Sequence, residues 1–432
     1  MTNPFDAIVL GAGIVGVSTA VHLQRCGLAV ALVDRKTPGT ETSYGNAGLI
    51  QREGVYPYAF PRQLATLLKY AGNRAPDVRY HLGALLKTAP FLLRYWRHSR
   101  SDRHAAIARL YAPLIEHCVA EHRALADAAG AGGLIRHQGW FKIFHDARTQ
   151  EAQTREAQKW FDEFGVAFEA CDAAALRQAE PDLSASLVGG LRYPDADTVS
   201  DPGALAAAYA RHFDSLGGRI LHGDANTLEP GWKVRTREGD ITARAAVVAL
   251  GPWSGDLVNT RLRYRLPLAV KRGYHRHYEP APGARLNHPV LDVANGFLLA
   301  PMSRGIRVTT GIEFADRDAP KTPAQIAAVE PMARGLFPLG RPVEAEPWMG
   351  ARPCTPDMLP IIGPAPRHKD LWFAFGHAHH GLTLGPVTGR LIAQMMTGAQ
   401  TFVDPAPFRA DRFCPGFRVQ VPFFVVRRNA VL

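Results

Sequence analysis

The sequence predicts an α/β protein with a parallel sheet in one domain and a second domain of mixed helices and strands. Residues 7–34 follow a strand–helix–strand pattern, the unit from which parallel sheets are built. Residues 245–250 form another buried run that stops at small residues, as strands do at the ligand-binding edge of such a sheet. Residues 262–345 are rich in short β runs and indicate the second domain. These runs are Leu266–Val270, Phe297–Ala300 and Ile306–Gly311.

The first strand–helix–strand unit carries a dinucleotide-binding motif. Ala7–Leu10 is an apolar strand, and Gly11, Gly13 and Gly16 give GxGxxG at the turn into the helix. These glycines allow a tight turn, close approach to a pyrophosphate and close helix packing, while the helix N-terminus attracts phosphates. The second strand ends in Asp34, whose carboxylate suits the two ribose hydroxyls and disfavours a 2′-phosphate. The sequence therefore predicts a bound dinucleotide.

A glycine-rich polar loop follows this unit. Residues 35–39 form a turn, and residues 42–48 are small and polar. Such a segment brings backbone donors close to a ligand. Its place after the second strand favours a cofactor contact over a plain surface loop.

Composition excludes several classes of protein. The chain has 432 residues, enough for about two domains, with 47% hydrophobic and 21% charged residues. Its net charge is +11, but no basic nucleic-acid motif is present. Five scattered cysteines without CxxC indicate neither a disulfide framework nor a zinc site. Because no signal peptide or long apolar run is visible, we expect a cytoplasmic protein or one on the inner membrane face.

Residues 60–110 are strongly basic and amphipathic. Ten Lys and Arg residues stand against two Asp residues, which gives the segment a net charge of +8. Its apolar residues are large. They are Leu64, Leu67, Leu68, Tyr70, Leu85, Leu86, Phe91, Leu92, Leu93, Tyr95 and Trp96. Helices of this kind bind membrane surfaces, and solvated helices packed on the second domain are the alternative.

The remaining elements follow from periodicity and turn residues. Helices are expected at Pro113–Ala129, Thr149–Phe164, Pro202–Leu216 and Val387–Met396. Strands are expected at Gly139–Phe144, Gly217–Ile220 and Leu371–Phe375, and a hairpin at 232–243. Turns are expected at Leu187–Pro202 and a loop at Gly376–Pro386.

Five motifs together resemble one family. Besides Gly11–Gly16 with Asp34, they are Thr42–Gly48, Ala249–Ser254 (ALGPWS), Arg352–Gly363 (RPCTPDMLPIIG) and Gly376–Thr383 (GHAHHGLT). In this order they resemble the flavin-dependent amine and D-amino acid oxidoreductases, most closely the bacterial D-amino acid dehydrogenase branch. Residues 60–110 resemble an insertion of that branch, which acts with a membrane electron acceptor.

The resemblance implies FAD in a glutathione-reductase-like fold. The FAD-binding Rossmann domain would be discontinuous, with a mixed α+β substrate domain inserted. The expected FAD-binding parts are 1–59, 165–261 and 346–417, the substrate parts are 60–164 and 262–345, and 418–432 is an extension. The expected cofactor residues are Gly11, Gly13, Ile14, Gly16, Asp34, Arg35, Thr42, Ser43, Asn46, Ala47, Gly48, Gly251, Trp253, Gly376, His377, Gly381, Leu382 and Thr383.

The chain departs from the family pattern in three places. Sarcosine-oxidase-like relatives attach flavin to a cysteine where this chain has Gly350, so we expect non-covalent FAD and a packing role for Cys354. The Pro-Arg that clamps the substrate carboxylate in relatives is Pro301-Met302 here. Residues 418–432 extend past the expected end and suit either docking to a partner or membrane, or an edge strand.

Amine oxidation requires a positioned Cα hydrogen and a neutral amine, without an obligatory side-chain base. A carboxylate substrate favours a guanidinium clamp. Arg352 is the first candidate, with ordering of its loop as the alternative, and Arg307 is the second. Tyr274 could cap the carboxylate or be a core tyrosine, and His379 or His380 could line the substrate end. The HxHH pattern at 377–380 suits a flavin loop better than a metal.

The predicted reaction is therefore oxidation of a D-amino acid to a 2-oxo acid and ammonia. Hydride passes to flavin N5, and the electrons then pass to a quinone or another respiratory acceptor. One alternative is a secondary amine acid of the hydroxyproline, sarcosine or opine type. The other is a NAD-binding or non-catalytic nucleotide-binding protein. No nucleic-acid partner is expected.

Overall fold

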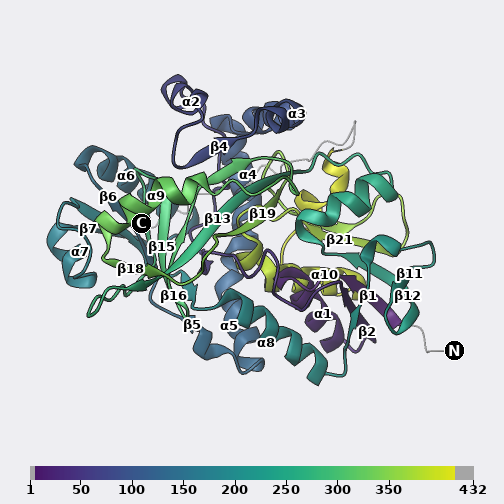
Figure 1. Cartoon of the computed structure of the whole chain (residues 1–432). Helices are drawn as coiled ribbons and strands as arrows, with labels where there is room; N and C mark the ends of the chain where they lie inside the picture. Colours follow the sequence, from purple (N-terminus) through teal and green to yellow (C-terminus); the bar gives the residue numbers. More distant parts are fainter. Residues whose placement is uncertain (1–4, 414–432) are drawn as a thin grey trace, which may run out of the picture.

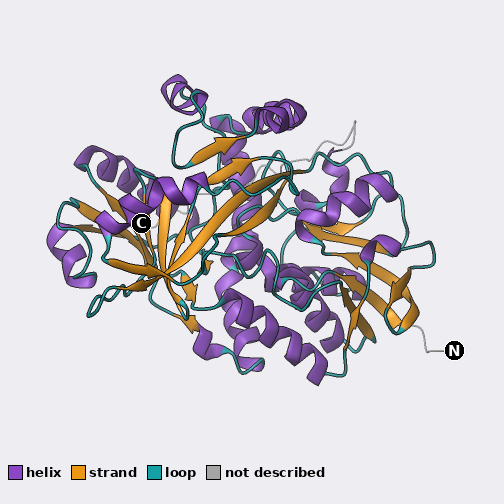
Figure 2. Ribbon diagram, viewed as in Figure 1, coloured by secondary structure: helices purple, strands orange, loops and turns teal. Residues whose placement is uncertain are grey.

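The structure is a computed structural model that describes residues 5–413. Two β-sheets occupy opposite sides of the molecule and are surrounded by helices (Figure 1, Figure 2). Residues 418–432 lie outside the described residues, so neither expectation for this extension is tested.

The first sheet is mostly parallel, as the N-terminal motif predicts. Its order is β10 (Arg219–His222), β2 (Val30–Asp34), β1 (Phe5–Leu10), β12 (Gly239–Val248), β21 (Leu371–Phe375) and β20 (Ile361–Pro364), with β11 (Lys233–Thr236) paired to β12. Because β1 is parallel to both β2 and β12, their carboxyl ends meet at one edge. Ala7 and Val9 pack in one buried cluster and Ile8 and Leu10 in another, as alternation along a strand requires.

Helices cover the Ala7 and Val9 side of this sheet. They are α1 (Ile14–Arg25), α8 (Pro202–Ser215) and α10 (Gly381–Thr397), and α1 packs against both of the others. Asp201 caps α8 by accepting from the Ala204 backbone N–H at 2.9 Å, and Pro202 begins the helix.

The second sheet is larger and mixed. Its order is β4 (Val78–Tyr80), β17 (Ile312–Phe314), β13 (Ala269–Pro280), β16 (Gly305–Thr309), β15 (Phe297–Met302), β14 (Val290–Asp292), β6 (Trp140–Phe144), β8 (Gly189–Tyr193) and β7 (Glu169–Asp172), and β18 (Leu339–Pro342) and β19 (Trp348–Cys354) pair with β13. A small sheet joins β3 (Leu49–Ile50), β9 (Asp197–Val199) and β5 (Ile135–Arg136). The remaining helices are α2 (Leu64–Ala71), α3 (Leu82–His98), α4 (Ser101–Glu116), α5 (Cys118–Ala128), α6 (Ala147–Phe164), α7 (Ala173–Ala179) and α9 (Ala324–Leu336).

The last long helix begins earlier than predicted, because a proline inside it is compensated. We expected a loop to Pro386, but α10 already begins at Gly381. Proline has no N–H to donate to the carbonyl four residues earlier, which belongs to Leu382. His122 on α5 lies 2.7 Å from that oxygen through Nε2 and replaces the missing bond. The first turn of α10 therefore depends on α5.

Three other expectations are corrected. The helix expected at Pro113–Ala129 is divided between the end of α4 and the whole of α5. α4 begins before the proline, and its buried stripe of Ile107, Tyr111 and Leu114 continues through it. The turn-rich stretch 187–202 contains β8 and β9. Gly189 is needed there because a Cβ would lie 2.3 Å from the Cys171 carbonyl oxygen on β7.

The third correction concerns the strand expected at 266–270. β13 begins at Ala269 and continues through the polar residues to Pro280. These polar residues tolerate burial because they are paired: Arg272 contacts Glu313 at 2.8 Å, and His277 contacts Glu344 at 2.6 Å.

The expected domain boundaries stay a prediction, but two segments lie in a different sheet from the one expected. β7 and β8 fall within 165–261 and yet pair in the second sheet. β19, within 346–417, pairs with β13 along its whole length. The second sheet therefore contains three strands, β7, β8 and β19, that the predicted domain boundaries assign to the FAD-binding domain.

Candidate active site

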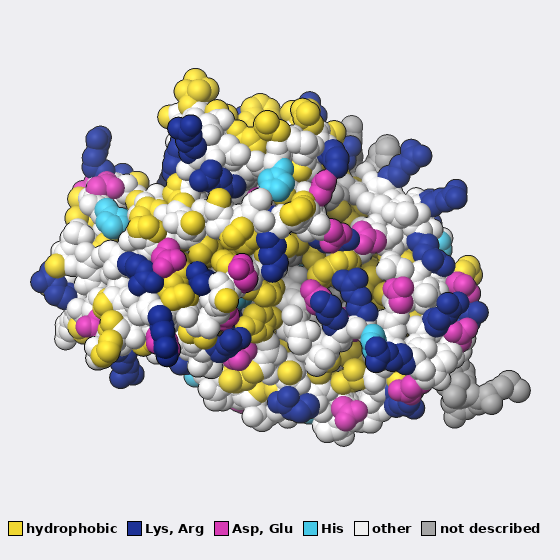
Figure 3. Space-filling model, in the orientation of Figure 1, with side chains coloured by type: hydrophobic (Ala, Val, Ile, Leu, Met, Phe, Trp, Pro, Cys, Tyr) yellow, Lys and Arg dark blue, Asp and Glu magenta, His cyan; other side chains and the backbone are white. Residues whose placement is uncertain are grey.

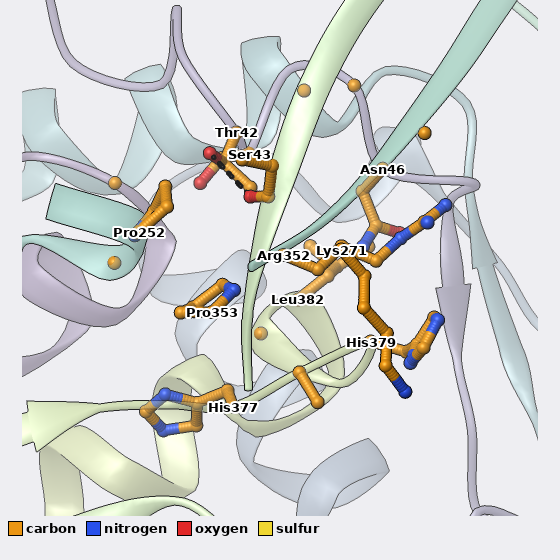
Figure 4. A pocket seen from close by; sticks show the side chains of 18 of the residues that line it. Thr42, Ser43, Asn46, Pro252, Lys271, Arg352, Pro353, His377, His379 and Leu382 are labelled. Carbon is orange, nitrogen blue, oxygen red and sulfur yellow. Dashed lines mark hydrogen bonds between the residues drawn. The ribbon is translucent and has the colours of Figure 1, made fainter. Parts of the chain in front are cut away.

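A cavity of about 580 Å³ is lined by residues of both sheets, a size that suits a small-molecule ligand (Figure 4). The predicted residues that line it are Gly11, Gly13, Ile14, Asp34, Arg35, Thr42, Ser43, Asn46, Ala47, Gly251, Trp253, Tyr274, Arg352, His377, Gly381 and Leu382. The predicted residues that do not line it are Gly16, Gly48, Gly376, Thr383, His380 and Arg307.

Two glycines shape the turn between β1 and α1. Gly11 has φ +105°, and a Cβ there would lie 2.5 Å from the Ala249 carbonyl oxygen. A Cβ on Gly16 would lie 1.8 Å from the Gly11 carbonyl oxygen, so Gly16 packs the helix on the turn instead of lining the cavity. Gly13 has no side chain to cap α1, and Ser43 Oγ accepts from the Ile14 backbone N–H at 2.9 Å, so the N–H groups that follow Ile14 are the ones that can meet an anionic ligand.

Asp34 lies at the same edge of the sheet. Its Oδ2 accepts from the Ala12 backbone N–H at 2.6 Å, and its Oδ1 accepts from the Lys36 backbone N–H at 2.8 Å. These bonds hold the carboxylate beside the start of α1, where its other lone pairs can accept from ribose hydroxyls. The Arg35 guanidinium lies 4.8 Å from the centre of the Trp253 ring and forms another part of the lining.

The loop at 42–48 connects this end of the cavity with its middle. Ser43 Oγ accepts from the Ile14 backbone N–H at 2.9 Å, which fixes the loop to the start of α1. Gly48 donates from its backbone N–H to Asn46 Oδ1 at 2.9 Å. A Cβ on Gly48 would lie 2.4 Å from the Val199 carbonyl oxygen, so this glycine serves chain packing.

A second helix N-terminus meets the cavity at Gly381 and Leu382, the first residues of α10. No side chain caps this helix. Thr383 is buried behind it and donates from Oγ1 to the Leu49 carbonyl oxygen at 3.2 Å. Two helix starts on one cavity fit a ligand with a pyrophosphate near α1 and a second electron-rich group near α10.

Arg352 lies on β19 and lines the cavity. Its guanidinium stacks across Gly273, where a Cβ would lie 2.6 Å from Nη1. Nη1 donates to the Gly311 carbonyl oxygen at 3.1 Å. No carboxylate among residues 5–413 lies within 4.0 Å of this cation. Burial in the protein lowers the pKa of Arg352, but a guanidinium keeps its charge in proteins. The half-buried side chain is a cation that an anionic ligand can pair with.

Tyr274 belongs to the cavity lining but is buried and behaves as a core residue. Its hydroxyl accepts from Arg272 at 2.8 Å and donates to Glu313 at 2.9 Å. Both bonds belong to a buried network on the other side of β13 from Arg352. The geometry does not favour the predicted role of capping a substrate carboxylate.

Arg307 and His380 also make their hydrogen bonds outside the cavity lining. Arg307 donates to the backbone carbonyl oxygens of Tyr44 (3.0 Å) and Asn46, so it holds the loop at 42–48 from behind. His380 Nδ1 lies 2.8 Å from the Tyr111 hydroxyl, and burial lowers its pKa to about 4. Both residues support the site from outside its lining.

Three residues that line the cavity around Arg352 were not predicted from the sequence: Lys271, Tyr58 and Tyr95. His379, which was named as an alternative to His380, also lines the cavity. Tyr58 and His379 have ring centres 4.4 Å apart. Strand alternation offered one signal: once Arg272 and Tyr274 are assigned to one face of β13, Lys271 must lie on the other.

The described lining contains no cysteine, and it includes Gly350, the position at which the family resemblance led us to look for an attachment cysteine. Cys354 is buried outside the lining, as expected. Within residues 5–413 no group of three His, Cys, Asp or Glu side chains could hold a metal ion. The donors present therefore suit a non-covalently held organic cofactor.

Comparison with known proteins assigns the cofactor. The model of the FAD dependent oxidoreductase family matches residues 6–395. A D-amino-acid oxidase of Bradyrhizobium diazoefficiens is 33% identical over 94% of this chain and 98% of its own length. A D-amino acid dehydrogenase of Chromohalobacter salexigens is 30% identical over 94% of this chain and 99% of its own.

Solved structures confirm the fold. Glycine oxidase from Geobacillus kaustophilus superposes with a TM-score of 0.70 at 23% identity, over 95% of this chain and 99% of its own. L-proline dehydrogenase from P. horikoshii also gives a TM-score of 0.70, at 17% identity, over 96% of this chain and 98% of its own. The predicted α/β fold with an FAD-binding Rossmann domain, and the predicted FAD, are confirmed. The chain belongs to the FAD-dependent oxidoreductase family that includes D-amino acid oxidases and dehydrogenases.

Proposed function

We propose that the protein oxidises D-amino acids to 2-oxo acids and ammonia and passes the electrons to a quinone or another respiratory acceptor. The observation that carries this proposal is Arg352, a cation without a carboxylate partner in the described residues, on the lining of the FAD cavity. FAD supplies the hydride acceptor. Relatives named as D-amino acid oxidase and dehydrogenase support the choice of substrate.

The residues around Arg352 suit amine oxidation. The guanidinium would bind the α-carboxylate and so orient Cα. Tyr58 and Tyr95 add aromatic walls that limit water around the reacting carbon. His379 is a further titratable ring on this part of the lining, and burial, then the Arg352 and Lys271 charges, hold its pKa well below the ordinary value. His379 is therefore neutral at physiological pH.

A substrate panel tests the proposal. The purified holoprotein should reduce an artificial acceptor with D-amino acids, at a kcat/KM at least about tenfold higher than with L-enantiomers or N-substituted amino acids. Oxygen consumption measured in parallel should be slow. Faster turnover of N-substituted amino acids would instead favour a secondary amine substrate. Rapid peroxide formation would favour an oxidase over a dehydrogenase.

We also propose that α2 and α3 contact a membrane surface. Their exposed residues are large and apolar: Leu64 is 71% exposed, Leu82 is 72% exposed and Leu86 is 78% exposed. Leu68, Leu93 and Trp96 are exposed on the same two helices. Figure 3 shows hydrophobic side chains gathered along this edge of the molecule, beside Lys and Arg. A leucine face flanked by cations suits the interface of an anionic bilayer.

No described helix is long and apolar enough to cross a bilayer. The α2–α3 surface lies close to the cavity, because Tyr70 on α2 and Tyr95 on α3 belong to the lining. A membrane-dissolved acceptor could therefore approach on this side.

Vesicle sedimentation tests this surface. A variant with serine at all four positions Leu64, Leu68, Leu82 and Leu86 should show at least about tenfold less binding to anionic vesicles. The reason is that most of the apolar area that the membrane would bury is lost. Binding of the unaltered protein should weaken with salt. The control is Phe161→Ser with Val343→Ser, which removes exposed apolar residues elsewhere. Equal vesicle binding by both variants would end the membrane proposal.

A further inference from the structure

We propose that Trp348 binds FAD by packing its indole against the benzenoid half of the flavin ring, the half that carries the two methyl groups. Trp348 is the first residue of β19 and was not among the residues predicted from the sequence. The inference rests on the FAD that the family comparison assigns, and it does not depend on which amine the protein oxidises.

The register of β13 and β19 places Trp348 on the cavity face. Along β19, Trp348, Gly350 and Arg352 alternate onto one side of the sheet, and all three line the cavity. On β13, Gly273 pairs with Gly350, so the sheet has no side chains at this point. The Arg352 guanidinium lies across one glycine of the pair, and the Trp348 indole lies across the other. The indole and the guanidinium are therefore neighbours on one wall of the cavity.

The indole is fixed in place by three neighbours. A Cβ on Gly350 would lie 2.1 Å from its Cη2, and a Cβ on Gly45 would lie 1.8 Å from its Cζ3, so a side chain at either position would displace it. The His275 ring stacks on it, with ring centres 4.8 Å apart and planes at 21°. Burial, then the Arg307 charge, lowers the pKa of His275 to about 2, so this ring is uncharged. The half-buried indole therefore offers a rigid apolar surface to the cavity.

The direction of β19 places this indole at one end of the flavin ring. Cys354, the last residue of the strand, bridges to His377 in the loop before α10, whose N-terminus suits the electron-rich pyrimidine edge of flavin. Gly350 lies four residues back along the strand, about 13 Å from Cys354. Trp348 reaches over Gly350 from still further away. Because the benzenoid half is the end of the ring opposite the pyrimidine edge, it is the end that Trp348 can contact.

The 42–48 loop supports the same placement from a different element. Ser43 is bonded to the start of α1, and Leu49, just after the loop, is bonded to the first turn of α10. The loop therefore spans the cavity from the pyrophosphate end to the pyrimidine end. Gly45 lies between these two anchors and packs directly on Trp348. Trp348 thus lies beside the part of the cofactor between its two anchored ends.

An indole suits the chemistry of this end of the flavin. The benzenoid half has two methyl groups and no strong hydrogen-bonding group, so packing is the main contact that a protein can offer it. Gly350 has no thiol that could form a covalent link. The Trp348 indole supplies a large, flat apolar surface at this place.

The test compares FAD with ADP, which has the adenosine and pyrophosphate of FAD but no flavin. Full-length Trp348→Ala, freed of flavin, should bind FAD about 10- to 100-fold more weakly than the unaltered chain, because stacking and buried apolar area are lost. Its affinity for ADP should stay within about twofold, because the adenosine end is distant. ADP binding also shows that the variant is folded. Trp348→Phe should recover part of the FAD affinity. Titration calorimetry measures both ligands.

Trp253→Ala is the matched control. Trp253 is also half-buried and lines the other end of the cavity, where the Arg35 guanidinium lies 4.8 Å from its ring centre. This variant should lose affinity for FAD and for ADP alike. Equal losses for both ligands in Trp348→Ala would overturn the inference, because Trp348 would then only support the shape of the site. Unchanged FAD affinity in Trp348→Ala would overturn it as well.

A chemical probe gives a measurement on the unaltered holoprotein. FAD with chlorine in place of the C8 methyl reacts with an added thiol where this edge is accessible, as sulfur bonds to C8 and chloride leaves. The bound probe should react at least about tenfold more slowly than the free probe, because the indole covers the edge. In Trp348→Ala much of this protection should be lost. Reaction of the bound probe at the rate of the free probe would overturn the inference.

Discussion

Replacing Arg352 with methionine is expected to lower kcat/KM for D-amino acid oxidation by about 10²- to 10³-fold, with FAD retained. Removing one partner of a desolvated charge pair typically costs about 2–5 kcal/mol, or about 30- to 5,000-fold, and the expected loss lies in the middle of this range. Methionine keeps much of the side-chain volume beside Gly273. Arg352→Lys should recover only part of the loss, because an ammonium cannot form the two parallel bonds of a guanidinium.

The measurement compares steady-state kinetics with the flavin content of each variant. Arg276→Met is the matched control: this arginine also lies on the second sheet and donates to backbone carbonyl oxygens, at 2.9 and 2.8 Å, but does not line the cavity. Its kcat/KM should stay within about twofold. If Arg352→Met binds FAD and keeps the activity of the unaltered protein, another residue must bind the substrate carboxylate.

Gly16→Ala is expected to weaken FAD binding by about 10- to 100-fold. The added methyl carbon would lie 1.8 Å from the Gly11 carbonyl oxygen, so α1 must move away from the turn. Overpacking of this kind costs about 1–3 kcal/mol, and here it displaces the N–H groups that would meet the pyrophosphate. The variant should be purified with little flavin and should bind added FAD weakly.

Gly335→Ala controls for the substitution itself, since a Cβ at this helical glycine meets nothing within 4 Å. It should carry FAD normally. Circular dichroism and a melting temperature measured with and without added FAD separate weak binding from failure to fold. Full flavin content in Gly16→Ala would show that the turn relaxes without moving α1.

The sequence was sufficient to predict the cofactor site where one continuous segment determines both the local structure and the ligand contacts. The segment from Gly11 to Asp34 is such a case, because the glycine turn, the helix start and the Asp34 carboxylate follow one another in the chain. The predicted role of Arg307 came from its strand position alone. Its carbonyl partners in the 42–48 loop lie more than 260 residues away, and no local pattern announces them.

Buried polar strands were the other source of error. The stretch 271–277 contains Lys, Arg and His, so it lacks the apolar run that marks an interior strand. Only the partners, Glu313 and Glu344, explain how these residues are buried. Lys271 was missed for the same reason, although strand alternation places it on the opposite face of β13 from Arg272.

The bond from His122 to the Leu382 carbonyl oxygen also constrains the order in which the protein can fold. It joins residues 260 positions apart, and it completes the turn of α10 that faces the cofactor. Contacts of such long sequence separation form late, after both segments exist and the intervening chain is ordered. During synthesis the N-terminal motif emerges first, but its cofactor site is finished only when α10 docks on α5. We therefore expect FAD to bind late in folding, because a chain that ends before α10 lacks the part of the flavin site that Gly381 and Leu382 form.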